Sequence, residues 1–276
     1  MPIHTHTTSG GGGDSSVTEL ETWDATSDLT AKTITTAGSH TLYASDGVTA
    51  RATIVVTVVG DMASGWSVVC DASASPPIKL SGVEYSGSGA AGYINVQVEP
   101  AFSSQPDWVR DRWFAEVLYS GLTINGASAS ESESLRFGAA PVGSVLTDDG
   151  SNDIGINHQG GSTYVWRRET WTDSDQLIIS PTAAPSSAAL LLIDSRRDRL
   201  ALLNGGTDFA SDLTSGGTWT ADTIGHGQIA SSGNTGTGDY STGLGVTLHA
   251  FSAATGDGVS IGISKIKLSV GAPRED

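Results

Sequence analysis

The chain contains a single cysteine, Cys70, among its 276 residues. A framework of intrachain disulfides is therefore excluded, and a packed core must stabilise the fold. Because Cys70 follows the apolar segment 66–69, we expect it to be a buried, small hydrophobic residue and not a nucleophile.

Basic residues are also scarce. Only 14 Lys and Arg residues stand against 30 Asp and Glu residues, so the formal net charge is -16. Proteins that neutralise nucleic-acid phosphates need a basic patch. The only dense basic cluster, Arg196, Arg197 and Arg199, is interrupted by Asp198 and is typical of a solvated turn. We therefore predict no nucleic-acid partner.

Long hydrophobic runs are missing as well. No apolar segment approaches the roughly 20 residues of a membrane helix. Residues 1–9 have neither the basic nor the apolar region of a secretory signal. We therefore expect no membrane insertion, and a protein that is made and assembled inside a cell.

What the chain does contain is glycine, at 35 residues, together with abundant Ser and Thr. This composition favours an all-β fold of many short strands joined by tight turns. One helical turn is predicted at 105–112, and the alternating segments 78–85 and 261–268 are predicted to pair. Strands are predicted from residue 61 onward at 66–70, 78–85, 92–99, 113–119, 134–138, 153–157, 163–171, 176–180, 189–194, 199–203, 218–224, 243–250 and 259–270.

The composition also predicts three parts along the chain. Residues 1–28 are a polar, glycine-rich leader or arm, which is too polar to fold without a partner. Residues 29–60 are a small β unit for attachment or oligomerisation, with a hairpin turn at 45–47. Residues 61–276 are predicted to form an antiparallel β-sandwich, for which the resemblance described next implies a jelly roll.

Five segments of the third part, taken in order, resemble the SPRY-type branch of the concanavalin-like jelly-roll family. Residues 112–117 (RWFAEV) resemble its aromatic-aromatic-x-Glu strand, and residues 135–140 (LRFGAA) resemble the glycine-containing strand that follows it. Residues 153–156 (DIGI), 190–194 (LLLID) and 202–206 (LLNGG) resemble its later strands and Asn-Gly turn. The resemblance covers roughly residues 63–271. It implies binding of peptides or glycans by loops at one end of the sandwich, without a cofactor.

The leader and the overall texture are similar to those of tailed-bacteriophage structural proteins. The leading hypothesis is a non-enzymatic virion structural protein of the tail-fibre, receptor-binding or head-fibre type, which is located on the virion surface, synthesised and assembled in the host cytoplasm, and binds a host-surface glycan or protein. Residues 1–60 would contact other virion proteins and further copies of the chain, with a trimer favoured. The alternatives are a capsid decoration protein that stabilises the shell and a polysaccharide-degrading enzyme.

Aromatic and charged residues at 166–171 give the most suggestive ligand-binding pattern. On a strand, Trp166 and Arg168 share one face, whereas Arg167, Glu169 and Trp171 share the other. Aromatic rings pack on sugar rings, and Arg and Glu bond hydroxyl groups. The same Trp residues could instead belong to the core, and Trp219 and Trp108 carry the same two interpretations; Trp113 is expected in the core.

Two segments carry candidate metal ligands. Asp149, Ser151 and Asp153 have the spacing of calcium ligands, although an EF-hand is excluded because Ile154 and Gly160 occupy its Gly and Glu positions. A lectin-like structural calcium or a plain acidic turn remains. His4 and His6 would face the same way on a strand and could share a metal at a symmetry axis, or lie on a neighbouring subunit.

The enzyme alternative depends on Asp194, which ends an apolar strand. A glycosidase needs two carboxylates at a defined separation, and Glu116, Glu169 and Asp198 are the possible partners. Asp194 could equally bond the following turn or pair with Arg196 or Arg197.

Overall fold

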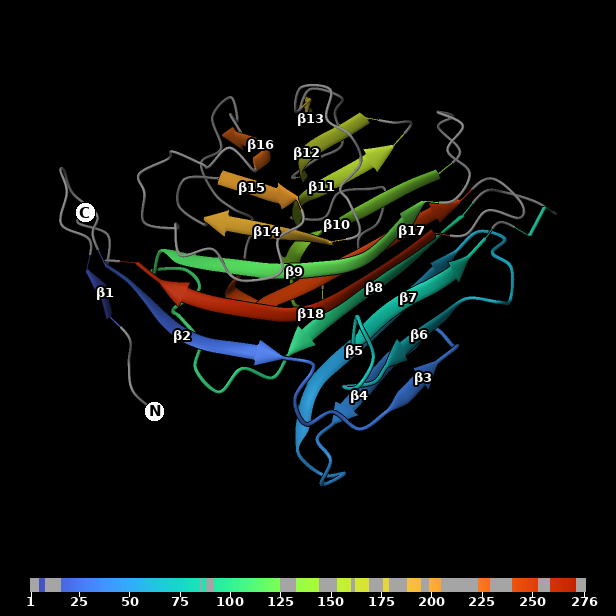
Figure 1. The fold of residues 1–276 in the computed structure, drawn as a ribbon, viewed down its shortest axis with the longest axis horizontal. Coiled ribbons are helices and arrows are strands. Elements are labelled where there is room, and N and C mark those ends of the chain that lie inside the picture. The colour runs from blue at the N-terminus through green and yellow to red at the C-terminus, as the bar shows by residue number, and fades with distance from the viewer. Residues whose placement is uncertain are drawn as a thin grey trace.

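The chain folds as two antiparallel β-sheets stacked into a sandwich (Figure 1). This confirms the all-β prediction; within the described part, the only helical element is a short 3-10 turn, Tyr240–Thr242. The computed structural model describes residues 5–7, 16–84, 86–87, 92–124, 133–143, 153–159, 162–168, 176–178, 188–194, 199–204, 223–228, 240–252 and 259–271.

The first sheet, sheet A, has ten strands in the order β16-β15-β14-β9-β18-β7-β6-β3, with β2 also paired to β18 and β1 paired to β2. Its strands are β1 (Thr5–Thr7), β2 (Ser16–Asp24), β3 (Lys32–Ile34), β6 (Ser67–Cys70), β7 (Ile78–Val83), β9 (Trp113–Ile124), β14 (Ala188–Asp194), β15 (Arg199–Asn204), β16 (Thr223–Gln228) and β18 (Val259–Val270).

The second sheet, sheet B, has eight strands in the order β13-β12-β11-β10-β17-β8-β5-β4. Its strands are β4 (Gly38–Tyr43), β5 (Ala50–Val59), β8 (Gly92–Pro100), β10 (Glu133–Pro141), β11 (Asp153–Gln159), β12 (Ser162–Arg168), β13 (Gln176–Ile178) and β17 (Leu244–Ser252).

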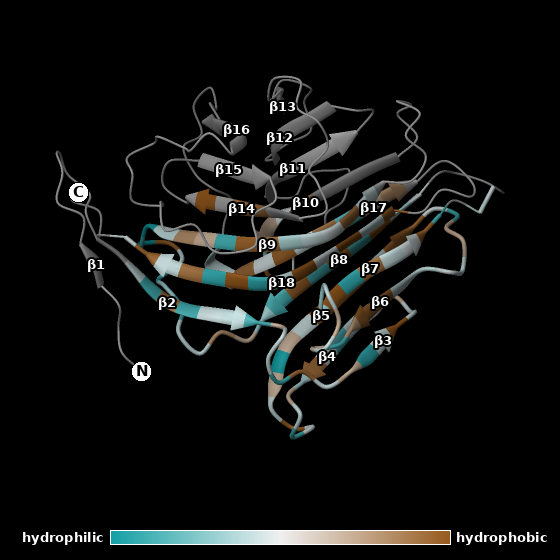
Figure 2. Cartoon of the chain, in the orientation of Figure 1, coloured by the Kyte–Doolittle hydropathy of each residue, from teal (hydrophilic) through white to brown (hydrophobic). Residues whose placement is uncertain are grey.

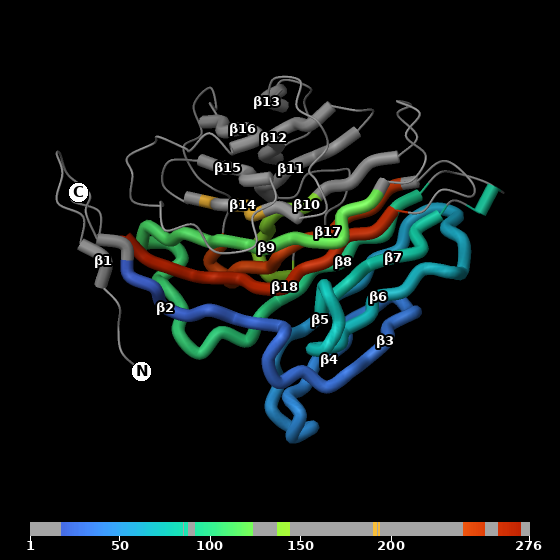
Figure 3. Tube along the Cα trace, in the orientation of Figure 1, coloured from blue at the N-terminus to red at the C-terminus, as the bar shows by residue number. Residues whose placement is uncertain are grey.

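Strand β18 occupies the middle of sheet A. It pairs with β9 along one side, and with β7 and then β2 along the other (Figure 3). The pairing of β18 with β7, which places Ile261 opposite Leu80, confirms the prediction made from their shared alternation. Strand β17 lies between β10 and β8 in sheet B. Each of the two consecutive strands β17 and β18 is thus an inner strand of a different sheet.

Alternation of side chains along the strands builds the core between the two sheets (Figure 2). On β5, for example, Ala52, Ile54 and Val56 are buried, whereas the residues between them are only half-buried. Two core tyrosines bond sheet B: Tyr119 Oη donates to Gly138 O at 2.9 Å, and Tyr240 Oη donates to Ala139 O at 3.0 Å.

Residues 16–60 contribute strands to the same two sheets, and the division into parts after residues 28 and 60 stays a prediction. Strand β2 pairs with β18, β3 pairs with β6, and β5 pairs with β8. Trp23, Ile34 and Ile54 belong to the common core. The polar composition of residues 16–28 is compatible with this position because β2 contributes few side chains to the core.

Two local predictions agree with the structure, and two predicted strands extend beyond the described residues. In the predicted hairpin turn, Asp46 Oδ1 accepts hydrogen bonds of 2.8 Å from Val48 N and Thr49 N. At the predicted helical turn, the chain makes one hydrogen-bonded turn and no helix, with Asp111 N donating to Asp107 O at 2.8 Å. The strands predicted at 163–171 and 218–224 correspond to β12 and β16 over their described residues, whereas 169–171 and 218–222 lie outside the described residues.

Among the described residues, the structure contains no helix with the length and apolar character required to cross a bilayer.

Burial of Cys70 leads to a prediction about alkaline pH. The residue is fully buried, as predicted, and burial raises the pKa of its thiol from 9.0 to about 12, against a smaller opposing effect of Lys32. The folded chain therefore keeps this proton to a higher pH than the unfolded chain, so this contribution to stability is complete below pH 9.0 and is lost toward pH 12.

The expected result is that the free energy of unfolding falls less steeply above pH 9.0 in Cys70→Ala than in the parent chain. Denaturant titrations at increasing pH measure this difference in slope. Equal slopes in the two proteins, or rapid labelling of folded Cys70 by a thiol reagent, would contradict the assignment.

Candidate functional site

The face of sheet B that points away from the core carries polar side chains that are nevertheless buried. On β8, Asn95 and Gln97 alternate with core residues and are 2% and 1% exposed. On β17, Thr247 and His249 do the same and are 1% and 2% exposed. Since successive residues of a strand point to opposite faces, all four belong to the outward face.

Register brings these four residues together in two neighbouring pairs. Asn95 lies opposite His249, and Gln97 lies opposite Thr247. Directly opposed residues of antiparallel strands have their side chains on the same face, within contact of each other. We call this group of four residues the polar patch.

Two oxygen atoms of the polar patch have no hydrogen-bond partner among the described residues: Asn95 Oδ1 and Gln97 Oε1. The Gln97 amide is oriented by its nitrogen, which donates to Pro141 O at 3.1 Å. Gly245 leaves room for it, because a Cβ there would lie 2.5 Å from Gln97 Nε2. Buried acceptors without a donor are uncommon and destabilising, so these two atoms mark a place where a donor is expected to bind.

An aromatic ring borders the polar patch. The rings of Tyr93 and His249 lie 4.7 Å apart between centroids, with an angle of 30° between their planes. Tyr93 comes from β8, on the same face as Asn95. The contact fixes the imidazole beside Asn95, so the patch combines amide, hydroxyl and imidazole groups with an apolar ring.

The same register connects the polar patch to the ligand-binding residues predicted from the sequence. The row that contains Thr247 continues through Gly138 on β10 and Gly155 on β11 to Trp166 on β12. Two adjacent positions of this row therefore carry no side chain. Position 166 shares the outward face with the polar patch, which the sequence did not reveal.

The other predicted contacts are only partly placed. Arg168 is in line with Trp166 on β12 and lies opposite Asp153, whereas Arg167 lies opposite Ile154, in the row of the core residue Ala139. Because β12 is a strand, position 167 lies on the opposite face of the sheet from positions 166 and 168, as expected. Glu169, Trp171 and Trp219 lie outside the described residues, and Trp108 packs edge-on against the core residue Trp113 at 5.5 Å.

The predicted metal ligands stay a prediction. Asp149, Ser151 and His4 lie outside the described residues. Asp153 begins β11, and His6 lies on β1 opposite Val17. Within the described ranges, no three His, Cys, Asp or Glu residues are grouped so that they could hold a metal ion.

Two of the four carboxylates considered for an enzyme occupy outward-facing positions of sheet A. Glu116, on β9, is fully buried, and its carboxylate contacts the Lys267 ammonium directly across from it on β18. Burial lowers the pKa of Lys267, and the charge of Glu19 partly opposes this shift. Asp194 lies on β14 opposite Phe114, two rows from Glu116; Glu169 and Asp198 lie outside the described residues. The Glu116 contact is a structural ion pair.

Comparison with known proteins gives no family. No protein-family model and no curated protein sequence matches the chain. Similar solved structures include a Shewanella oneidensis protein of unknown function (11% identity, TM-score 0.42, 89% of this chain and 88% of that chain), the endo-1,3-beta-glucanase of Streptomyces sioyaensis (11%, 0.44, 95% and 99%) and the carbohydrate recognition domain of Emp46p (12%, 0.38, 77% and 87%). Of these three, one is a carbohydrate recognition domain, one is a glucanase and one has no known function.

The Glu116–Lys267 pair gives a stability prediction. Lys267→Met leaves a buried carboxylate without its countercharge, and breaking a buried pair in this way costs about 3 kcal/mol. Lys265→Met is the matched control on the same strand, because the Lys265–Asp24 pair is partly exposed and an exposed pair contributes about 1 kcal/mol or less.

Urea unfolding of both variants measures the difference. The double variant Glu116→Leu with Lys267→Met is expected to recover most of the stability, since no buried charge remains. Equal, small losses in Lys267→Met and Lys265→Met would show that Glu116 does not depend on Lys267.

Proposed function

We propose that this chain is a carbohydrate-binding protein whose ligand lies on the outward face of sheet B, at the polar patch. The observation that carries the proposal is the pair of buried amide oxygens, Asn95 Oδ1 and Gln97 Oε1, that have no donor among the described residues. They lie two residues apart on one strand, beside a threonine and a histidine. Both oxygens are closed to solvent, so binding requires the cover over the polar patch to open, and a ligand that presents several hydroxyl groups then supplies the missing donors.

The chemistry of the patch favours hydroxyl groups over an anionic group at this position. Amide oxygens only accept, so a carboxylate or phosphate placed against them would bring no hydrogen. Hydroxyl groups donate to these oxygens and also accept from imidazole and threonine. The glycines at 138 and 155 allow close approach of a ligand between the patch and Trp166. A Trp at the end of this row would supply the apolar surface on which a sugar ring packs.

The proposal extends to the residues that the sequence suggested and to the setting of the protein. Arg167, Arg168, Glu169, Trp171 and Trp219 are proposed further contacts. The proposed setting is the surface of a tailed-bacteriophage virion, with the chain made in the host cytoplasm and displayed as a homo-oligomer, a trimer being favoured. Many copies on one particle would raise the avidity of a shallow site for a host-surface glycan.

Replacement of Asn95 separates binding from stability. Asn95→Leu keeps the side-chain size and removes the unpartnered oxygen, so glycan binding is expected to be lost. Because a buried acceptor without a donor costs about 1–3 kcal/mol, the folded state should become no less stable. Glycan-array screening followed by calorimetry with the best glycan measures binding, and urea unfolding measures stability.

Thr53→Ala is the matched control for this experiment. Thr53 lies on the same face, on β5, but its register partner is Glu99 and not a residue of the patch. Its replacement should leave binding unchanged. Retained glycan binding in Asn95→Leu, or an absence of binding to any host glycan by the parent chain, would refute the proposed site.

The virion setting is tested separately, by immunogold electron microscopy of purified phage particles. Labelling of tail fibres or head fibres is the expected result. Uniform labelling of the capsid, together with loss of heat resistance in particles that lack the protein, would instead identify a shell-stabilising decoration protein. Release of reducing ends from host polysaccharide would identify an enzyme.

A further inference from the structure

Strand β2 is held by residues that are distant from it in sequence. Its backbone pairs with β18 from Thr18 opposite Val270 to Asp24 opposite Lys265. Trp23 is buried in the common core, and its Nε1 donates to Arg51 O at 2.8 Å. The strand is therefore held by backbone pairing, a buried side chain and a hydrogen bond, all made to residues outside its own segment.

A carboxylate in the middle of β2 adds specificity to this contact. Glu21 Oε2 accepts three hydrogen bonds, from Ser103 N at 2.7 Å, Ser103 Oγ at 2.8 Å and Ser104 N at 2.9 Å. Three donors converging on one oxygen make a site for an anionic group, as charge-assisted hydrogen bonds are stronger than neutral ones. We call the edge of β18 at 265–270, together with residues 103–104 and Arg51 O, the β2 site.

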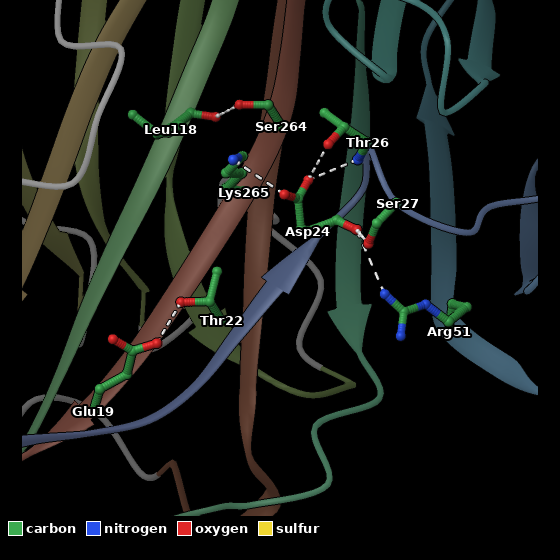
Figure 4. A network of polar contacts seen from close by, with 9 residues as sticks. All are labelled: Glu19, Thr22, Asp24, Thr26, Ser27, Arg51, Leu118, Ser264 and Lys265. Atoms are coloured by element: carbon green, nitrogen blue, oxygen red, sulfur yellow. Dashed lines mark hydrogen bonds and ion pairs between the residues drawn. The ribbon is translucent and has the colours of Figure 1, made fainter. Parts of the chain in front are cut away.

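The end of β2 is fixed by a second carboxylate (Figure 4). Asp24 Oδ2 lies 3.1 Å from Lys265 Nζ, while its Oδ1 accepts from Thr26 N at 2.8 Å and from Thr26 Oγ1 at 2.6 Å. Burial would raise the pKa of Asp24, but the Thr26 hydrogen bonds and Lys265 outweigh it, so the pKa lies below 3.8. The β2 site thus supplies hydrogen-bond donors for Glu21 and a countercharge for Asp24, on a strand that comes from a chain of net charge -16.

The connection between β2 and the sandwich is short and sharply turned. Thr26 and Ser27 are bonded back to Asp24, and Asp28 has a φ of 53°, a left-handed conformation that residues with a Cβ rarely adopt. Thr30 N then donates to Tyr43 O at 2.8 Å, which fixes the chain again. An extended connection would free Asp28 from this conformation and carry β2 away from its own β18. Short, strained connections of this kind favour exchange of an element between copies.

We propose that β2 is an exchangeable strand: the β2 site of one copy binds residues 16–24 of a second copy, so that the chain associates with itself through this strand. The bound partner is an extended, acidic segment whose Trp enters the core and whose carboxylates meet Lys265 and the donors of residues 103–104. The exchanged pair keeps every contact described above except those within the turn. The inference does not depend on glycan binding.

Disulfide trapping between two full-length variants tests the exchange. Thr18→Cys and Val270→Cys are made in separate chains, because these positions lie directly opposite each other in the paired strands. The native Cys70 is fully buried and does not interfere. The two chains are unfolded, mixed at high concentration, refolded and oxidised. The expected result is a disulfide-linked heterodimer, which requires β2 of one copy to occupy the β2 site of the other.

Two controls complete the experiment. Thr18→Cys mixed with Ser264→Cys should give no crosslink, because residue 264 lies beyond the opposite end of the paired region. Deletion of Thr26 and Ser27 prevents β2 from reaching its own β18, so light scattering should show a dimer and no monomer for this variant. A monomeric deletion variant, or a mixture in which the opposed pair crosslinks no more than the Ser264 control, would overturn the proposal.

Discussion

Three strands pair with the backbone of β18, and these hydrogen bonds fix the arrangement of sheet A. β9 covers one edge of β18, while β7 and β2 divide the other edge between them. Hydrogen bonds can satisfy both edges of a strand only when its neighbours keep register, so displacement of β18 would disturb segments from both ends of the chain. The residues that alternate with its core side, such as Lys265 and Lys267, provide the countercharges for Asp24 and Glu116.

The sequence predicted the positions of the strands better than it predicted which strands pair with each other. Alternation located β18 and its pairing with β7, and the apolar neighbourhood of Cys70 and Trp113 placed both in the core. It did not assign β2 to the sandwich, since a strand that contributes mainly Trp23 to the core has the composition of a polar arm. Pairing with a strand distant in sequence determines whether such a segment belongs to a sheet, and local composition does not predict that pairing.

The polar patch was missed for a related reason. Asn95 and Gln97 alternate with apolar residues along β8, a pattern typical of a strand with one face in water. Their burial is a tertiary effect and leaves no mark on the local pattern. Trp166 was proposed because an aromatic ring packs on a sugar ring while neighbouring Arg and Glu bond hydroxyl groups, but only register through Gly138 and Gly155 relates its position to the patch. A period-two run of amides flanked by glycines on neighbouring strands is the signal that could have indicated it.

The central position of β17 and β18 also sets the order of events during synthesis. These two strands leave the ribosome after every strand that flanks them. Until β17 is made, the facing edges of β8 and β10 have no partner, and until β18 is made, the facing edges of β7 and β9 have none. Unpaired edges in a nascent chain invite pairing with other chains, and pairings between distant segments form slowly. The nascent protein therefore exposes unpaired strand edges in both sheets until β17 and β18 are synthesised. The yield of folded molecules will depend on how long those edges stay unpaired.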